Sequence, residues 1–121
     1  MEHDPIQFRV EFIIKEGKIE DYKKLVQEMS RVVKANELDT IGYQFYLDST
    51  ETKCVVCETY SNSEAALTHN ISIESKTMLS KIFSVARIHK FEVYGNPSKK
   101  LQKVLANFNA QTYNLIAGFS R

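Results

Sequence analysis

Two residues with acid–base side chains, Glu58 and His69, stand on either side of a short polar turn. The stretch around them reads C-E-T-Y-S-N-S-E-A-A-L-T-H. The residues before the turn favour a strand, because branched and aromatic side chains suit a pleated sheet. Ser61 and Glu64 have the spacing of a capping box, which predicts a helix that carries His69. If this helix packs back on the sheet, a carboxylate and an imidazole can meet in one pocket.

Both residues also have an ordinary structural interpretation. A lone histidine on a helix is usually a surface residue or a satisfied core residue, and Glu58 at a strand end can reach solvent or a nearby lysine. If Glu58 is buried among apolar side chains, its pKa is raised. Histidine suits proton transfer because its ordinary pKa lies near neutral pH. The pair is therefore a hypothesis for an acid–base site, and the spacing leaves open whether the two side chains meet.

The composition favours some classes of protein and argues against others. The chain has 121 residues, of which 43% are hydrophobic, and a formal net charge of +1. This length suffices for one core, so we expect a single domain over residues 1–121. The balanced charge argues against nucleic acid and anionic membranes as partners, and no apolar run approaches the roughly 20 residues of a membrane-spanning helix. The start of the chain lacks the features of a secretory signal, so we expect a cytoplasmic protein.

Cys54 and Cys57 have C-x-x-C spacing but lie in a segment that reads as a strand. Residues three apart on a strand point to opposite faces, and no second cysteine pair exists to complete a zinc site. We therefore expect two structural thiols and no metal site.

The hydrophobic pattern predicts the elements that would position Glu58 and His69. A period of three to four residues predicts an amphipathic helix over 18–36. Helical signals resume near Ser63, with a break around Ser72 and a second stretch over 74–79. Alternating apolar residues predict strands over four segments: 6–14, 41–47, 53–60 and about 86–94.

On the last predicted strand, Arg87 and His89 share a face with Phe91, which is unusual for a simple core. They are candidates for a ligand or subunit contact, and an edge position would explain them equally well. After this strand, Ser98 can cap a further helix, and the tail over 110–119 carries apolar residues that should dock on the domain or on a partner.

The order strand, helix, strand, strand, helix, strand is that of an α+β, ferredoxin-like fold with an antiparallel sheet. Such a sheet carries helices on one face only. Its second face, with alternate apolar residues, needs cover. We therefore predict a homodimer in which two sheets pack together.

The run E-T-Y-S-N-S-E-A-A-L-T-H, with an amphipathic helix before a G-Y-Q-F-Y strand, resembles the antibiotic biosynthesis monooxygenase family of dimeric α+β barrels. The similarity covers about residues 6–94, and residues 95–121 resemble an extension found in some members. The resemblance implies a cavity between sheet and helices in each subunit. It also implies the oxidation of a small aromatic or quinol-type substrate by dioxygen, with no cofactor.

In this comparison His69 and Glu58 match the positions of the family motif. The resemblance implies that His69 takes a proton from a substrate hydroxyl, and that Glu58 orients the imidazole or holds that hydroxyl. The candidate substrate-binding residues are the aromatic walls of the pocket: Tyr60, Tyr43, Phe45 and Tyr22.

The same family includes other activities. Its haem-degrading branch uses Asn, Trp and His, whereas this chain has no Trp and carries Val10 at about the position of that Asn. Haem degradation is therefore not expected. A proton-transfer isomerase in the same pocket, for which Arg87 and His89 would bind a phosphorylated substrate, and a non-catalytic dimeric ligand-binding module remain alternatives.

Overall fold

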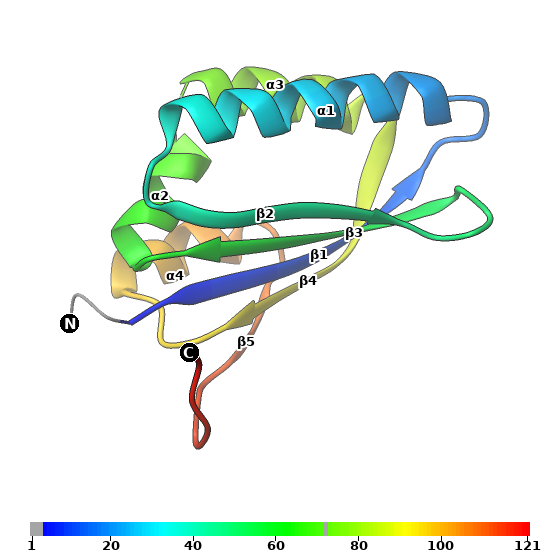
Figure 1. The fold of residues 1–121 in the computed structure, drawn as a ribbon. Coiled ribbons are helices and arrows are strands. Elements are labelled where there is room, and N and C mark those ends of the chain that lie inside the picture. The colour runs from blue at the N-terminus through cyan, green and yellow to red at the C-terminus, as the bar shows by residue number, and fades with distance from the viewer. Residues whose placement is uncertain (1–3, 72) are drawn as a thin grey trace.

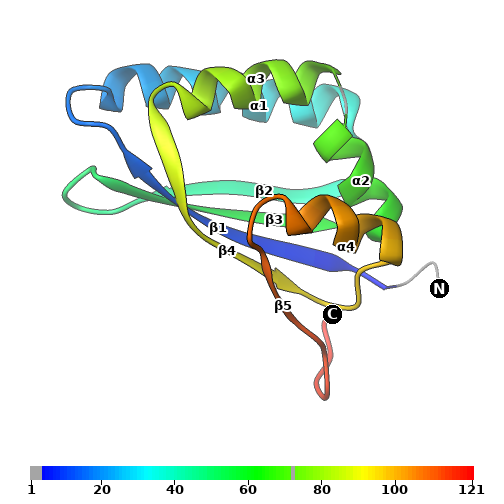
Figure 2. The ribbon, with the colours of Figure 1, turned by 180° about the vertical axis from the view of Figure 1, so that it is seen from behind.

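A computed structural model describes residues 4–71 and 73–121. Its sheet has the order β2-β3-β1-β4-β5. The strands are β1 (Ile6–Ile14), β2 (Thr40–Leu47), β3 (Lys53–Tyr60), β4 (Ala86–Tyr94) and β5 (Gln111–Tyr113). The helices are α1 (Ile19–Asn36), α2 (Ser63–Ile71), α3 (Ile73–Phe83) and α4 (Lys99–Ala106). Figures 1 and 2 show α1 and α3 side by side over the sheet, with α2 and α4 near the end where β3 finishes.

The strand pairing confirms the predicted ferredoxin-like fold. β1 lies between β3 and β4, β2 pairs with β3, and all three pairings are antiparallel. The short β5 adds to β4 in parallel and makes the sheet mixed. The second helical region is divided into α2 and α3, and the predicted break at Ser72 lies outside the described residues. α3 is longer than the predicted stretch over 74–79.

The core forms between the inner face of the sheet and the helices. On β1 the alternate residues point inward, as the sequence predicts, and are buried: Ile6, Phe8, Val10, Phe12 and Ile14. They pack with the apolar stripe of α1, which includes Tyr22, Met29 and Val33. Burial of one large apolar side chain contributes about 1.5–3 kcal/mol. This packing fixes the helices at a set position above the strands.

The start of α2 differs from the predicted capping box. Asn62, rather than Ser61, caps the helix, because its Oδ1 accepts a hydrogen bond of 2.9 Å from the Ala65 backbone N–H. Ser61 instead donates its hydroxyl hydrogen to the Asp39 carbonyl. The helix therefore begins at Ser63, at the residue predicted, but by a different cap.

A β-bulge in β4 overturns the predicted face of that strand. Adjacent residues of β1 pair with Lys90 and Ile88, which leaves His89 as an extra residue. The bulge changes the side-chain alternation, so that Ile88 and Phe91 both face the core. Arg87 and His89 are exposed and do not line the cavity beside the core. They therefore do not form the site for a phosphorylated substrate that the isomerase alternative predicted in this pocket.

The outer face of the sheet is more polar than predicted. Arg9 on β1 lies 2.8 Å from the Glu11 carboxylate and 3.5 Å from that of Glu92. Lys53 also reaches Glu11, at 3.5 Å. Paired charges therefore occupy much of the face for which the sequence suggested apolar contacts, and the homodimer stays a prediction.

The C-terminal segment docks only in part. Ser98 caps α4 as predicted, because its hydroxyl oxygen accepts a hydrogen bond from the Leu101 backbone N–H. Beyond β5, the apolar side chains are exposed, up to 96% for Ile116.

Cys54 is buried and Cys57 half-buried on the opposite face, and both are free thiols, as expected. None of the described helices has the length and apolar character needed to cross a membrane.

Candidate active site

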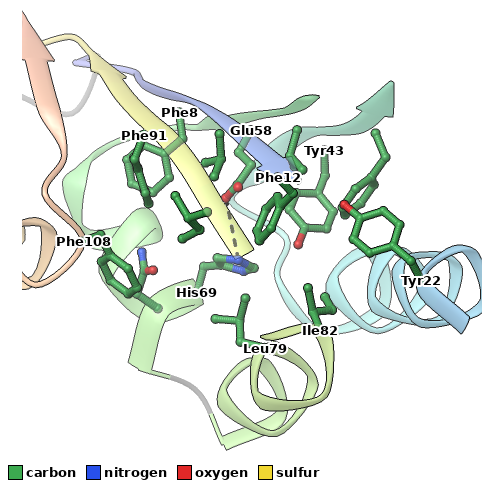
Figure 3. A pocket seen from close by; sticks show the side chains of 15 residues that line it. Phe8, Phe12, Tyr22, Tyr43, Glu58, His69, Leu79, Ile82, Phe91 and Phe108 are labelled. Atoms are coloured by element: carbon green, nitrogen blue, oxygen red, sulfur yellow. Dashed lines mark ion pairs between the residues drawn. The ribbon is translucent and has the colours of Figure 1, made fainter. Parts of the chain in front are cut away.

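The inner face of the sheet and the helices enclose a cavity of about 40 Å³, here called the inner chamber (Figure 3). Most of its lining is apolar and aromatic, and its polar side chains are Glu58, His69 and Asn70. The aromatic side chains are Phe8, Phe12, Tyr22, Tyr43, Phe45, Phe91 and Phe108. A few water molecules would fill this volume.

The structure brings Glu58 and His69 together in the inner chamber (Figure 3). The His69 Nε2 atom lies 3.7 Å from the Glu58 Oε1 atom, and the two side chains are only 4% and 10% exposed. Ala65 and Ala66 are buried on α2, and their small side chains let the helix approach the sheet closely. The distance exceeds that of a direct hydrogen bond, so both groups can contact the same atom of a ligand.

A second carboxylate, Glu37, holds the other ring nitrogen of His69. Its Oε1 and Oε2 atoms lie 2.9 and 3.2 Å from Nδ1, so Nδ1–H donates to the carboxylate. The Thr40 hydroxyl donates to Glu37 Oε1 at 3.0 Å and helps to fix it. A carboxylate on Nδ1 sets the tautomer and directs Nε2 toward the chamber. Glu37, rather than Glu58, thus makes the hydrogen bond that orients the imidazole, and the other role predicted for Glu58, holding a substrate hydroxyl, stays a prediction.

Tyr60 was predicted to line the pocket, but the structure places it outside the chamber. It is fully buried, does not line the inner chamber, and donates its hydroxyl hydrogen to Glu58 Oε1. Its hydrogen bond therefore helps to hold the Glu58 carboxyl group in position. The chamber is lined by the other predicted aromatic residues, Tyr43, Phe45 and Tyr22. The Tyr43 ring packs edge to face against the His69 imidazole, with 5.4 Å between the ring centroids.

The electrostatics of the site favour retention of a proton. Burial alone lowers the pKa of His69, but the hydrogen bond to Glu37 and the charges of both carboxylates outweigh it, so that pKa is raised. Burial raises the pKa of Glu58, although the His69 charge and the Tyr60 hydroxyl act in the opposite direction. The His69–Glu58 pair therefore holds a proton to a higher pH than either group would in water.

Comparison with known proteins gives matches among solved structures. No family profile matches the chain, and no curated protein does. MupZ from Pseudomonas fluorescens is 26% identical over 98% of this chain and 95% of its own, with a TM-score of 0.82. A Caulobacter crescentus protein named as an antibiotic biosynthesis monooxygenase is 18% identical over 80% of this chain and 92% of its own, with a TM-score of 0.69.

A further match is SnoaB from Streptomyces nogalater, described as a cofactor-independent oxygenase. It is 7% identical over 79% of this chain and 96% of its own, with a TM-score of 0.68. The fold is that of the antibiotic biosynthesis monooxygenases. The resemblance inferred from the sequence is thereby confirmed at the level of the fold.

Sequence reasoning missed Glu37 and much of the aromatic lining of the chamber. Glu37 caps the C-terminus of α1 and lies far from His69 in sequence, in a polar connection that reads as a simple helix end. No local spacing links the two residues. Phe108 follows α4 and reaches the chamber from the C-terminal segment. Its helical spacing from Leu101, Val104 and Leu105 predicts that it belongs to an apolar face, but not which cavity that face lines. Among the described residues, no cluster of His, Cys, Asp and Glu is arranged to hold a metal ion.

Proposed function

We propose that this protein is a cofactor-independent monooxygenase that oxidises a small aromatic or quinol-type substrate with dioxygen. One observation supports this most strongly. The His69 imidazole is buried, oriented by Glu37 through Nδ1, and directs Nε2 into an apolar chamber beside Glu58. Such an imidazole can remove a proton from a substrate hydroxyl, because its raised pKa makes it a stronger base than free histidine. The similarity of the fold to that of SnoaB, described as a cofactor-independent oxygenase, supports the proposed reaction with dioxygen.

The chemistry needs only the protein, the substrate and dioxygen. Proton transfer to Nε2 leaves an electron-rich aryloxide anion, and the two carboxylates stabilise the imidazolium that forms. The anion gives an electron to dioxygen, and the resulting carbon radical and superoxide combine to a peroxide anion, which takes the proton back from Nε2 and so restores the base. When this hydroperoxide loses water, a ring carbon or benzylic CH₂ becomes a carbonyl. One oxygen atom stays in the product, the other leaves as water, and the substrate supplies all the electrons.

A second function, proton transfer without dioxygen, is favoured by Glu58. Its raised pKa lets this carboxyl group carry a proton, and it lies 3.7 Å from a base. An acid and a base that face the same chamber suit isomerisation, in which a proton leaves one atom of the substrate and another is delivered nearby. Oxygen activation by itself needs only the base.

Oxygen uptake with a panel of quinols and anthrone-like substrates tests these functions. The purified, metal-stripped wild type is compared with His69→Gln and with His89→Gln, a matched control whose histidine is exposed and outside the chamber. Loss of a positioned general base lowers turnover by about 10²–10⁴-fold, so His69→Gln should be almost inactive and His89→Gln normal. Equal uptake by all three proteins would be autoxidation and would contradict the proposal. Conversion of substrate without oxygen uptake would support the second function.

We also propose that the protein is a homodimer, and its cytoplasmic location remains an expectation from the sequence. Exposed apolar side chains support association, among them Leu115, Ile116 and Phe119 in the C-terminal tail. Light scattering during size-exclusion chromatography should give twice the mass of one chain. The mass of one chain at micromolar concentration would contradict this.

A further inference from the structure

A larger groove lies beside the inner chamber, between α1 and β2. Its volume is about 440 Å³, and Tyr22, Tyr43 and Phe45 line both cavities, so these side chains form the wall between them. The inner chamber, at about 40 Å³, is too small for an aromatic ring, since a cavity that holds benzene measures roughly 150 Å³. A substrate that presents its hydroxyl to His69 from this side therefore keeps most of its body in the groove, and the shared aromatic side chains must move apart to admit the hydroxyl.

The hydroxyl of Tyr22 lies at this wall without a strong hydrogen-bond partner. Tyr22 is 1% exposed, and among the described residues its OH has only the Cys54 thiol, a weak partner, beside it. Buried hydroxyl groups are nearly always hydrogen-bonded, so a weakly paired one beside two cavities indicates a ligand atom as its partner. Figure 3 shows the Tyr22 and Tyr43 side chains next to one another at the edge of the chamber.

The polar side of the groove is cationic. Lys23, Gln27, Ser30 and Arg31 line it from one face of α1, and no acidic side chain is part of the lining. Lys23 is already paired, because its Nζ lies 2.8 Å from the Glu51 carboxylate and 3.5 Å from that of Glu20. Arg31 forms no ion pair within the described ranges and is exposed. The groove thus offers an uncompensated guanidinium, which suits a carboxylate.

We propose that the groove binds the body of an elongated substrate with an anionic end, which Arg31 holds, while the Tyr22 hydroxyl hydrogen-bonds to a polar atom at the wall. The substrate class is then a hydroxyaryl carboxylic acid, with its hydroxyl toward His69. The position of the reacting hydroxyl rests on the proposed function, whereas the acid-binding groove rests on Tyr22, Arg31 and the cavity volumes.

Calorimetric titration with para-hydroxyphenylacetate, -propanoate and -pentanoate tests the anion site, with the corresponding neutral amides as paired probes. In the wild type, the best acid should bind about two- to fivefold more tightly than its amide, the range expected for an exposed ion pair. Arg31→Gln should abolish this preference. Lys34→Gln, which removes an exposed cation of the same helix outside the groove, should leave it unchanged. Equal binding of acid and amide to the wild type, no binding of any acid, or equal effects of the two variants would overturn the proposal.

Tyr22→Phe tests the hydroxyl at the wall. It removes an oxygen whose neighbour is the weakly bonding Cys54 thiol, so the protein should unfold at nearly the same temperature while the acids bind less tightly. Lower stability with unchanged binding would show a structural hydroxyl and overturn this part. An acid preference without turnover on any substrate would remove the proposed function and keep the groove. Turnover without an acid preference would remove only the groove assignment.

Discussion

Glu37→Gln should weaken the fold in a way that depends on pH. The substitution keeps the size of the side chain and one acceptor for the His69 Nδ1–H, but it removes the charge 2.9 Å from that nitrogen. A hydrogen bond to a charged partner contributes about 1.5–3 kcal/mol, and a neutral one about 1 kcal/mol. The difference predicts a loss of about 0.5–2 kcal/mol in the free energy of unfolding where His69 is charged.

The sign of the pH dependence follows from the raised pKa of His69. A group with a higher pKa in the folded state stabilises the fold fully below its unfolded pKa, about 6.5 for histidine, and loses this contribution as pH rises through the folded value. The deficit of Glu37→Gln should therefore be largest near pH 6 and smaller at pH 9.

Urea unfolding of the wild type and Glu37→Gln at these two pH values measures the deficit. Glu28→Gln is the matched control, since Glu28 is an exposed carboxylate of α1 outside the site. It should change the free energy of unfolding by less than about 0.5 kcal/mol at either pH. A deficit of Glu37→Gln that is equal at both pH values, or larger at pH 9, would refute the role given to Glu37.

Three further predictions concern the site and its support. Turnover by the wild type, measured across pH, should rise through a pKa above the ordinary value of His69. Glu37→Gln should move this rise to lower pH, because it removes the charge that raises the pKa of His69. A rise at the same pH in both proteins would contradict the role of Glu37 in raising that pKa. Tyr60→Phe should lower the free energy of unfolding by about 1.5–3 kcal/mol in urea titrations, because it removes the buried donor to Glu58, and an unchanged midpoint would count against that bond. Ser98→Ala should cost about 1 kcal/mol through loss of the α4 cap, whereas Ser98→Thr should retain most of it.

The strands and the first helix could be predicted from the sequence because their apolar residues follow regular periods. β1 alternates over its whole length, and Tyr22, Met29 and Val33 fall on one face of α1. The β4 face could not be predicted, because a one-residue bulge at His89 changes the alternation without any mark in the local sequence. The cap of α2 was ambiguous, because several short polar residues in succession could each serve.

The candidate site could be predicted only where its residues are close in sequence. Glu58 and His69 belong to one strand–turn–helix unit, so their approach follows from the packing of α2 on the sheet. Glu37 reaches His69 through tertiary packing at the end of α1, which periodicity does not encode. The weakly paired Tyr22 hydroxyl and the groove beside it are also products of packing, because the sequence shows Tyr22 only as one residue of an apolar stripe.

The most direct test of the central claim is the ionisation of a bound phenol. A nitrophenol absorbs visible light as its anion, so its spectrum during titration with the protein reports proton transfer without any later step. The pH is set above the rise in turnover, where His69 is without its proton, and the probe is a ring-substituted nitrophenol that is still mostly neutral when free at that pH. The wild type should convert this bound probe to the anion, and His69→Gln should bind it without this change. Bound probe that stays neutral in the wild type, or the same anion signal in both proteins, would contradict His69 as the group that takes the proton.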